Sequence, residues 1–139
     1  MNYNYLNLIN NFKINNAFNK HEFHKIALSN KSGESLIYFS KTNANIGGAT
    51  LQFDRDMIVN KNSEKVILEK LDNLYKIKNQ HIFMKVDIEG HEDKFVDGSL
   101  EILRNNKILM YLETTNEVLL KKLKKMKFKI YYPKFFADK

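Results

Sequence analysis

Four ionisable side chains fall within segment 87–92, directly after an apolar run at 82–84. They are Asp87, Glu89, His91 and Glu92. Gly90 lies among them and allows a sharp backbone turn, so the segment is typical of a place where a strand passes into a helix. Ligands of open α/β sheets bind at the carboxyl ends of the strands. Segment 87–92, which we call the acidic turn, is therefore the first candidate for a functional site.

Three kinds of chemistry are open to the acidic turn. A carboxylate or His91 could act as a general base toward a substrate hydroxyl. The four side chains could instead hold a hard divalent cation such as Mg²⁺ or Mn²⁺, which oxygen ligands suit. The carboxylates could also hydrogen-bond a polyhydroxylated ligand such as a sugar. Spacing alone does not choose among the three.

A purely structural explanation accounts for only part of the pattern. Glu92 and Asp93 would gain ~0.3–1 kcal/mol each from the dipole of the helix that they begin. Asp87 and Glu89 would share one face of the strand end, where two like charges would be partly buried. Such pairs persist mainly where one carboxyl is protonated, is paired with a cation such as Lys85, or binds a ligand. The pattern favours a functional site.

Strands and helices alternate on both sides of the acidic turn. The preceding part predicts a helix at 5–16, a hairpin of strands at 23–29 and 34–40, a glycine-containing loop at 41–50, an irregular stretch at 54–63, a strand at 66–68 and a helix at 71–77. The strand at 81–88 is continuously apolar, which predicts burial on both faces of a parallel sheet.

The part that follows the acidic turn continues the alternation. It predicts a helix at 92–103, a buried strand at 108–113, a helix that begins with a capping box at 114–117, and a last strand at 128–132. Gly98 within the first of these helices costs ~1 kcal/mol relative to alanine, so we expect this helix to approach the sheet closely there. The order of the elements predicts an α/β fold with a mostly parallel, doubly wound sheet.

Composition indicates one domain over residues 1–139, large enough to bury a core. No apolar run approaches the ~20 residues that span a bilayer, and the first residues lack the pattern of a signal peptide. The chain has no cysteine, which excludes disulfides, thiolate catalysis and Cys-based zinc sites. We therefore expect a cytoplasmic protein.

The formal charge of +7 is concentrated in the Lys-rich C-terminal part of this domain, residues 104–139. That part holds ten basic and three acidic residues, whereas residues 1–103 hold thirteen of each. Such a face could meet nucleic acid or anionic lipid. Its helical part lacks interleaved aromatic residues, and Arg104 is its only arginine. A solvated lysine face is therefore favoured over a nucleic-acid interface.

A family resemblance follows from these residues in their order. Three stretches carry it, namely Lys-Val-Asp-Ile-Glu-Gly-His-Glu at 85–92, Phe-Val-Asp-Gly at 95–98, and Leu-Glu at the end of a strand at 112–113. Together they resemble the signature of the FkbM family of S-adenosylmethionine-dependent methyltransferases. Further similar stretches, in the same order, are 6–15, 27–33, 45–48 and 71–74. The resemblance implies a Rossmann-like fold of the class I methyltransferases and O-methylation of a hydroxyl on a sugar or other small molecule.

The resemblance also implies roles for particular residues. The catalytic candidates, which would lie beside the transferable methyl group without a separate role for each, are Asp87, Glu89, His91 and Glu92. The candidates for contact with the adenine of S-adenosylmethionine are Ala27, Leu28 and Ser29. The need for a divalent metal is left open.

The sequence departs from the family pattern in its first part. Family members have a strand with a glycine-rich turn for the methionine end of the cofactor, then a strand that ends in an acidic ribose ligand, and neither precedes Tyr5. Segment 43–48 does not replace that turn, because no apolar strand ending in Asp precedes it. We therefore expect a partial Rossmann-like sheet without its first two core strands, and weak cofactor binding unless a separate N-terminal polypeptide completes it. The alternative is a non-catalytic remnant or binding module whose basic C-terminal face meets an anionic partner.

Overall fold

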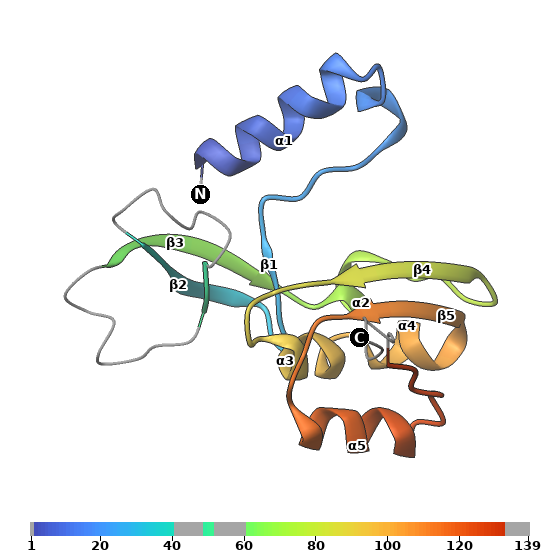
Figure 1. Ribbon diagram of the computed structural model, residues 1–139. Helices are drawn as coiled ribbons and strands as arrows, with labels where there is room; N and C mark the ends of the chain where they lie inside the picture. The colour runs from blue at the N-terminus through green and yellow to red at the C-terminus, as the bar shows by residue number, and fades with distance from the viewer. Residues whose placement is uncertain (1, 41–48, 52–60, 133–139) are drawn as a thin grey trace, which may run out of the picture.

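The computed structural model describes residues 2–40, 49–51 and 61–132 (Figure 1). In chain order, its elements are α1 (Asn2–Ile14), the 3-10 helix η1 (Phe18–Lys20), β1 (Ala27–Leu28), β2 (Gly33–Ser40), β3 (Lys61–Glu69), α2 (Leu71–Leu74), β4 (His81–Val86), α3 (Glu92–Asp97), α4 (Leu100–Asn105), β5 (Lys107–Leu112) and α5 (Glu117–Lys125). The predicted α/β class is confirmed. Residues 41–48 of the predicted loop at 41–50 and residues 54–60 of the predicted irregular stretch at 54–63 lie outside the described residues. Residues 61–63 belong to β3, so the irregular stretch is wrong there.

The strands form two sheets rather than one. In the first sheet β3 lies between the other two strands, parallel to β1 and antiparallel to β2. The predicted hairpin of 23–29 with 34–40 is therefore wrong. β2 pairs with β3 over eight residues, from Gly33 opposite Leu68 to Ser40 opposite Lys61. β1 is only two residues long, so it could form far fewer pairs with β2.

The second sheet consists of β4 and β5, which are parallel, with α3, α4 and α5 on one side of it (Figure 1). Its side chains alternate between half-buried and exposed positions. Phe83 and Leu109 keep 70% and 69% of their surface exposed, so the predicted burial of this strand on both faces is wrong. The predicted strand at 128–132 is not a strand either, because Phe128 and Ile130 pack against the core without pairing with β5.

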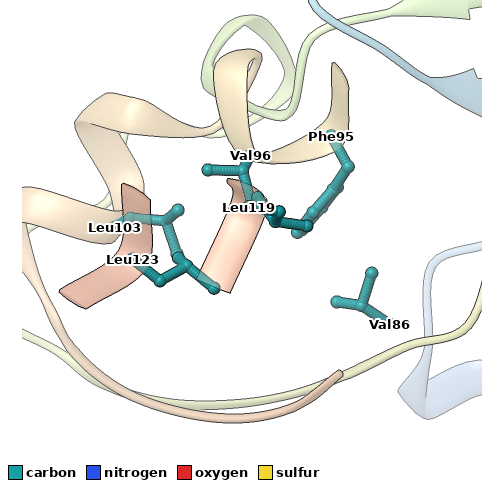
Figure 2. Close-up of a cluster of buried hydrophobic side chains, with 6 residues drawn as sticks. All are labelled: Val86, Phe95, Val96, Leu103, Leu119 and Leu123. Carbon is teal, nitrogen blue, oxygen red and sulfur yellow. The ribbon is translucent and has the colours of Figure 1, made fainter. Parts of the chain in front are cut away.

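The larger core lies between the second sheet and its helices. Figure 2 shows its six buried side chains, which are Val86, Phe95, Val96, Leu103, Leu119 and Leu123. Full burial of such a side chain contributes ~1.5–3 kcal/mol, so this cluster fixes α3, α4 and α5 beneath the carboxyl end of β4. An ion pair between Lys122 and Asp97 also joins α5 to α3.

The predicted helix at 92–103 is interrupted at Gly98. A Cβ atom on Gly98 would lie 1.9 Å from the carbonyl oxygen of Ser29, so the predicted close approach is confirmed, and its partner is the backbone after β1. The interruption leaves the N-terminus of α4 to be capped from outside the helix. Asp72 provides this cap, since its two carboxylate oxygens accept hydrogen bonds from the backbone of Glu101 and Ile102, each at 3.0 Å.

The N-terminus of α5 differs from the predicted capping box. Asn116, rather than Thr114, is the capping residue, and its side-chain oxygen accepts from the backbone N–H of Leu119 at 3.1 Å. Thr114 instead accepts from the backbone of Asn116, because the helix begins two residues later than the pattern indicated. In the described part of the chain, no helix is both long and apolar enough to cross a membrane.

Candidate functional site

The acidic turn begins as a loop, because β4 ends at Val86. Glu89 and Gly90 have positive φ angles of 51° and 90°, which redirect the chain into α3. Strand alternation therefore does not extend to Glu89, and both Asp87 and Glu89 are exposed. The prediction that these two carboxylates form a partly buried pair is wrong.

Two hydrogen bonds hold the turn in this conformation. The hydroxyl of Thr50, a buried residue, donates to the carbonyl oxygen of Glu89 at 2.9 Å. The backbone N–H of Gly90 donates to the carboxylate of Glu92 at 2.9 Å, and Glu92 is only 5% exposed. Sequence reasoning missed Thr50, because a threonine after a glycine pair gives no signal of a contact 39 residues away.

His91 joins the acidic turn to the end of β1. Its Nε2 atom lies 3.1 Å from the hydroxyl oxygen of Ser29, which is 2% exposed. The Ser29 hydroxyl also lies 3.5 Å from the side-chain oxygen of Asn30, and which atom donates between Ser29 and His91 depends on the tautomer of the ring. In the tautomer that carries its hydrogen on Nε2, Nδ1 keeps a lone pair that can accept a proton.

The surroundings of His91 keep its ring neutral. Burial lowers the pKa of His91 below its ordinary value, and the nearby Lys94 lowers it further, against an opposing effect of Asp93 and Glu92. A neutral imidazole near pH 7 is the form that a general base requires. The contact with Ser29 engages Nε2 rather than Nδ1.

Asp87 is paired with a neighbour on the strand that precedes it. Its carboxylate lies 3.0 Å from the ammonium of Lys85, and the hydrogen bond to Asp87 raises the pKa of Lys85. Pairing with Lys85 was one of the explanations that the sequence left open for an acid at this position. Both side chains remain accessible to solvent, so Asp87 can also meet a ligand.

The four acidic-turn candidates do not converge on one point. His91 contacts Ser29, Glu92 bonds within its own loop, and Asp87 pairs along the strand. Across residues 2–40, 49–51 and 61–132, no group of three or more His, Cys, Asp or Glu side chains could hold a metal ion. The described geometry therefore gives no support to the divalent-cation chemistry that the spacing left open.

The three adenine candidates are engaged in packing. Ala27 packs against the smaller core, formed by Ile37, Val66 and Leu68, and Leu28 packs against the larger core. Ser29 is buried and its hydroxyl contacts His91. Each of the three residues therefore has a packing or hydrogen-bonding role, and their contact with adenine stays a prediction.

Comparisons with known protein families, curated proteins and solved structures give no match to this chain. No relative therefore identifies its substrate or its activity. The chemistry of the acidic turn and of Ser29 is the basis for a functional proposal.

Proposed function

We propose that this chain provides the substrate side of an S-adenosylmethionine-dependent O-methyltransferase of the FkbM type. Its substrate would be a hydroxyl of a sugar or other small molecule, in a Rossmann-like cytoplasmic enzyme. One observation carries the proposal, namely the 3.1 Å contact between Ser29 and His91. The resemblance assigns these residues to the cofactor side and the methyl side of one reaction. Their contact joins the residue after β1 to the loop that follows β4, and in open α/β sheets ligands bind at the carboxyl ends of strands.

The described residues supply the proton-accepting part of such a reaction. S-adenosylmethionine, when bound, supplies the methyl group. His91 presents Nδ1 as the base for the substrate hydroxyl, and Ser29 orients the ring through Nε2. The exposed carboxylates of Glu89, and of Asp87 beside its pairing with Lys85, can accept hydrogen bonds from further hydroxyls. Methyl transfer depends chiefly on alignment, and general-base assistance adds ~10²–10⁴-fold.

The backbone of the acidic turn also supports a functional role. Glu89 adopts a left-handed conformation that costs a residue other than glycine ~1–3 kcal/mol, and such residues cluster at active sites. The hydrogen bond from Thr50 to the carbonyl of Glu89 stabilises this conformation. A turn whose only task was to connect β4 with α3 would be more stable with glycine at position 89.

Calorimetry with S-adenosylmethionine tests the proposal. Because Ala27, Leu28 and Ser29 are engaged in packing, we expect the chain alone to bind weakly, with a Kd of about 1 mM, equivalent to about −4 kcal/mol. S-adenosylhomocysteine should bind similarly. ATP is the control, because it carries the same adenosine group with a different substituent. Equal heats for ATP and S-adenosylmethionine would contradict cofactor recognition. Micromolar binding of S-adenosylmethionine would contradict the weak binding expected from the packing of Ala27, Leu28 and Ser29.

The alternative function is a binding module for an anionic partner. Its supporting observation is a set of exposed lysines on and after α5, which are Lys121, Lys124, Lys125, Lys127 and Lys129. Binding of heparin, used as a polyanion probe, should then fall steeply with added salt. Heparin binding that ignores salt, or that persists after these lysines are replaced by glutamine, would contradict this alternative.

A further inference from the structure

Three side chains with metal-ligating atoms meet at a place other than the acidic turn. They are Glu22 and His24, in the connection between η1 and β1, and Tyr75, the residue after α2 (Figure 1). The phenol oxygen of Tyr75 lies 2.9 Å from Nε2 of His24 and 3.0 Å from Oε2 of Glu22. The same atoms of His24 and Glu22 are 3.5 Å apart. One nitrogen and two oxygens therefore form a closed triangle.

The backbone of the connection explains why Glu22 and His24 point the same way. His21, just before them, has the extended angles φ −136° and ψ 149°, and in an extended chain residues two apart share a side. The intervening Phe23 lies on the other side, where its ring centroid is 4.8 Å from that of Phe12 on α1. The aromatic contact therefore anchors one side of the connection, and the two donors on the other side face the phenol.

The size of the triangle suits the first coordination shell of a zinc ion. Zn²⁺ binds nitrogen and oxygen ligands at about 2.0–2.1 Å in a tetrahedron, so that neighbouring ligand atoms lie about 3.3–3.4 Å apart. The observed distances of 2.9, 3.0 and 3.5 Å reach this range with shifts of about 0.5 Å or less. The side chains of His24 and Glu22 are 41% and 73% exposed, so an ion and a water ligand can reach them.

The types of donor select among metals. An imidazole beside two oxygens suits Zn²⁺ and its neighbours in the first transition series, whereas Mg²⁺ and Ca²⁺ prefer oxygen ligands alone. Only two of the three donors are of the His, Cys, Asp or Glu type, so the triangle is compatible with the lack of larger clusters of these residues in the described ranges. The phenol of Tyr75 supplies the third ligand.

We propose that Glu22, His24 and Tyr75 form a Zn²⁺ site with water as the fourth ligand. Metal ligands bind in deprotonated form, so the phenol of Tyr75 releases its proton to solvent when the ion binds. The ion joins the η1–β1 connection to the end of α2, which exposed polar contacts alone would hold only weakly. Bound Zn²⁺ thereby attaches α1 and η1 more firmly to the rest of the chain. The inference goes beyond the proposed chemistry and does not depend on it.

Two measurements on the whole chain test this site. Calorimetry with Zn²⁺ gives the affinity, and an ultraviolet difference spectrum reports ionisation of a phenol. We expect binding at a ratio of about one ion per chain, together with the spectrum of about one tyrosinate. Mg²⁺ at the same concentration should give neither signal.

Tyr75→Phe is the test variant, because it removes only the phenol oxygen. It should weaken Zn²⁺ binding about tenfold or more and abolish the tyrosinate spectrum. Tyr111→Phe is the matched control, since Tyr111 is an exposed tyrosine on β5, and it should change neither signal. His24→Gln, with His81→Gln at another exposed position as its control, provides a second pair. Circular dichroism establishes that each variant is folded.

Several outcomes would overturn the proposal. They are no binding of Zn²⁺, binding without a tyrosinate spectrum, equal binding by Tyr75→Phe, and equal binding of Mg²⁺. Loss of binding in His81→Gln as large as in His24→Gln would place the ion elsewhere and would also overturn it. The proposed methyl transfer is tested separately by the binding of S-adenosylmethionine, so either proposal can fail alone.

Discussion

Replacing Gly98 by alanine perturbs the contact that brings the two sheets together. In an ordinary helix this change would stabilise the protein by up to ~1 kcal/mol. Here the new Cβ atom would lie 1.9 Å from the carbonyl oxygen of Ser29. Because protein interiors are closely packed, the backbones at Gly98 and Ser29 must separate by about 1 Å or more.

That separation disturbs several interactions at once. Overpacking costs ~1–3 kcal/mol, and each strained hydrogen bond adds ~0.5–1.5 kcal/mol. The bonds affected are those from Ser29 N–H to Glu69 at 2.8 Å, from Asp72 N–H to Gly98 at 3.0 Å, and between Ser29 and His91 at 3.1 Å. Taking the lower end of each contribution, we expect Gly98→Ala to lose about 2.5 kcal/mol or more, a large share of a typical stability of 5–15 kcal/mol.

Urea unfolding monitored by circular dichroism measures this loss, and nuclear magnetic resonance of the His91 ring reports the contact itself. Gly33→Ala is the control. Gly33 has a φ of 144° and no atom within 4 Å of an added Cβ, so its replacement strains the backbone without a clash. Gly33→Ala should destabilise the protein and leave His91 unchanged, whereas Gly98→Ala should shift the His91 signals. A Gly98→Ala chain as stable as the wild type, with unchanged His91 signals, would refute the close approach.

Two further predictions concern Asp72 and His91. Asp72→Ala removes the cap of α4 and should lower the unfolding free energy by ~0.5–2 kcal/mol in urea titrations. Lys76→Ala, at an exposed neighbouring position, is the control and should have little effect. An unchanged urea midpoint for Asp72→Ala would argue against the cap. Burial lowers the pKa of His91, so the unfolded chain binds its proton more tightly. The stability that neutral His91 contributes is complete above the ordinary histidine pKa of about 6.5 and is lost as pH falls through that value toward the lower folded pKa. The unfolding free energy should therefore decrease less between pH 8 and 5 in His91→Gln than in the wild type. His81→Gln, at an exposed position, is the control. Identical pH profiles for His91→Gln and the wild type would contradict the buried ring.

Local patterns predicted most elements, but pairing and exposure depended on distant residues. The apolar run Ile82-Phe83-Met84 is compatible with a sheet covered on one face or on both. Its alternating exposure therefore could not be predicted from the run itself. The strand at 34–40 was predicted correctly, but its partner β3 lies beyond a long connection, and local spacing favoured the nearer strand. The interruption at Gly98 depends on the carbonyl of Ser29, which is remote in sequence.

The candidate site shows the same limit. Residue types placed the acidic turn at the carboxyl end of β4, and the structure has it there. The partners of its residues could not be predicted, because Ser29 and Thr50 reach the turn only through the packing of one sheet beside the other. Asp72 lies in the first turn of α2, and its carboxylate caps the N-terminus of α4, a contact that local spacing does not predict.

The claim that the ends of β1 and β4 form one methyl-transfer site is tested most directly by locating S-adenosylmethionine on the chain. The measurement is a titration of the ¹⁵N-labelled whole chain with S-adenosylmethionine, to several times a Kd of about 1 mM. We predict saturable shifts confined to residues 27–30 and 87–92, including the ring of His91. Signals that stay unchanged throughout, or shifts confined to the surroundings of the exposed residues Phe83 and Leu109, would contradict the account.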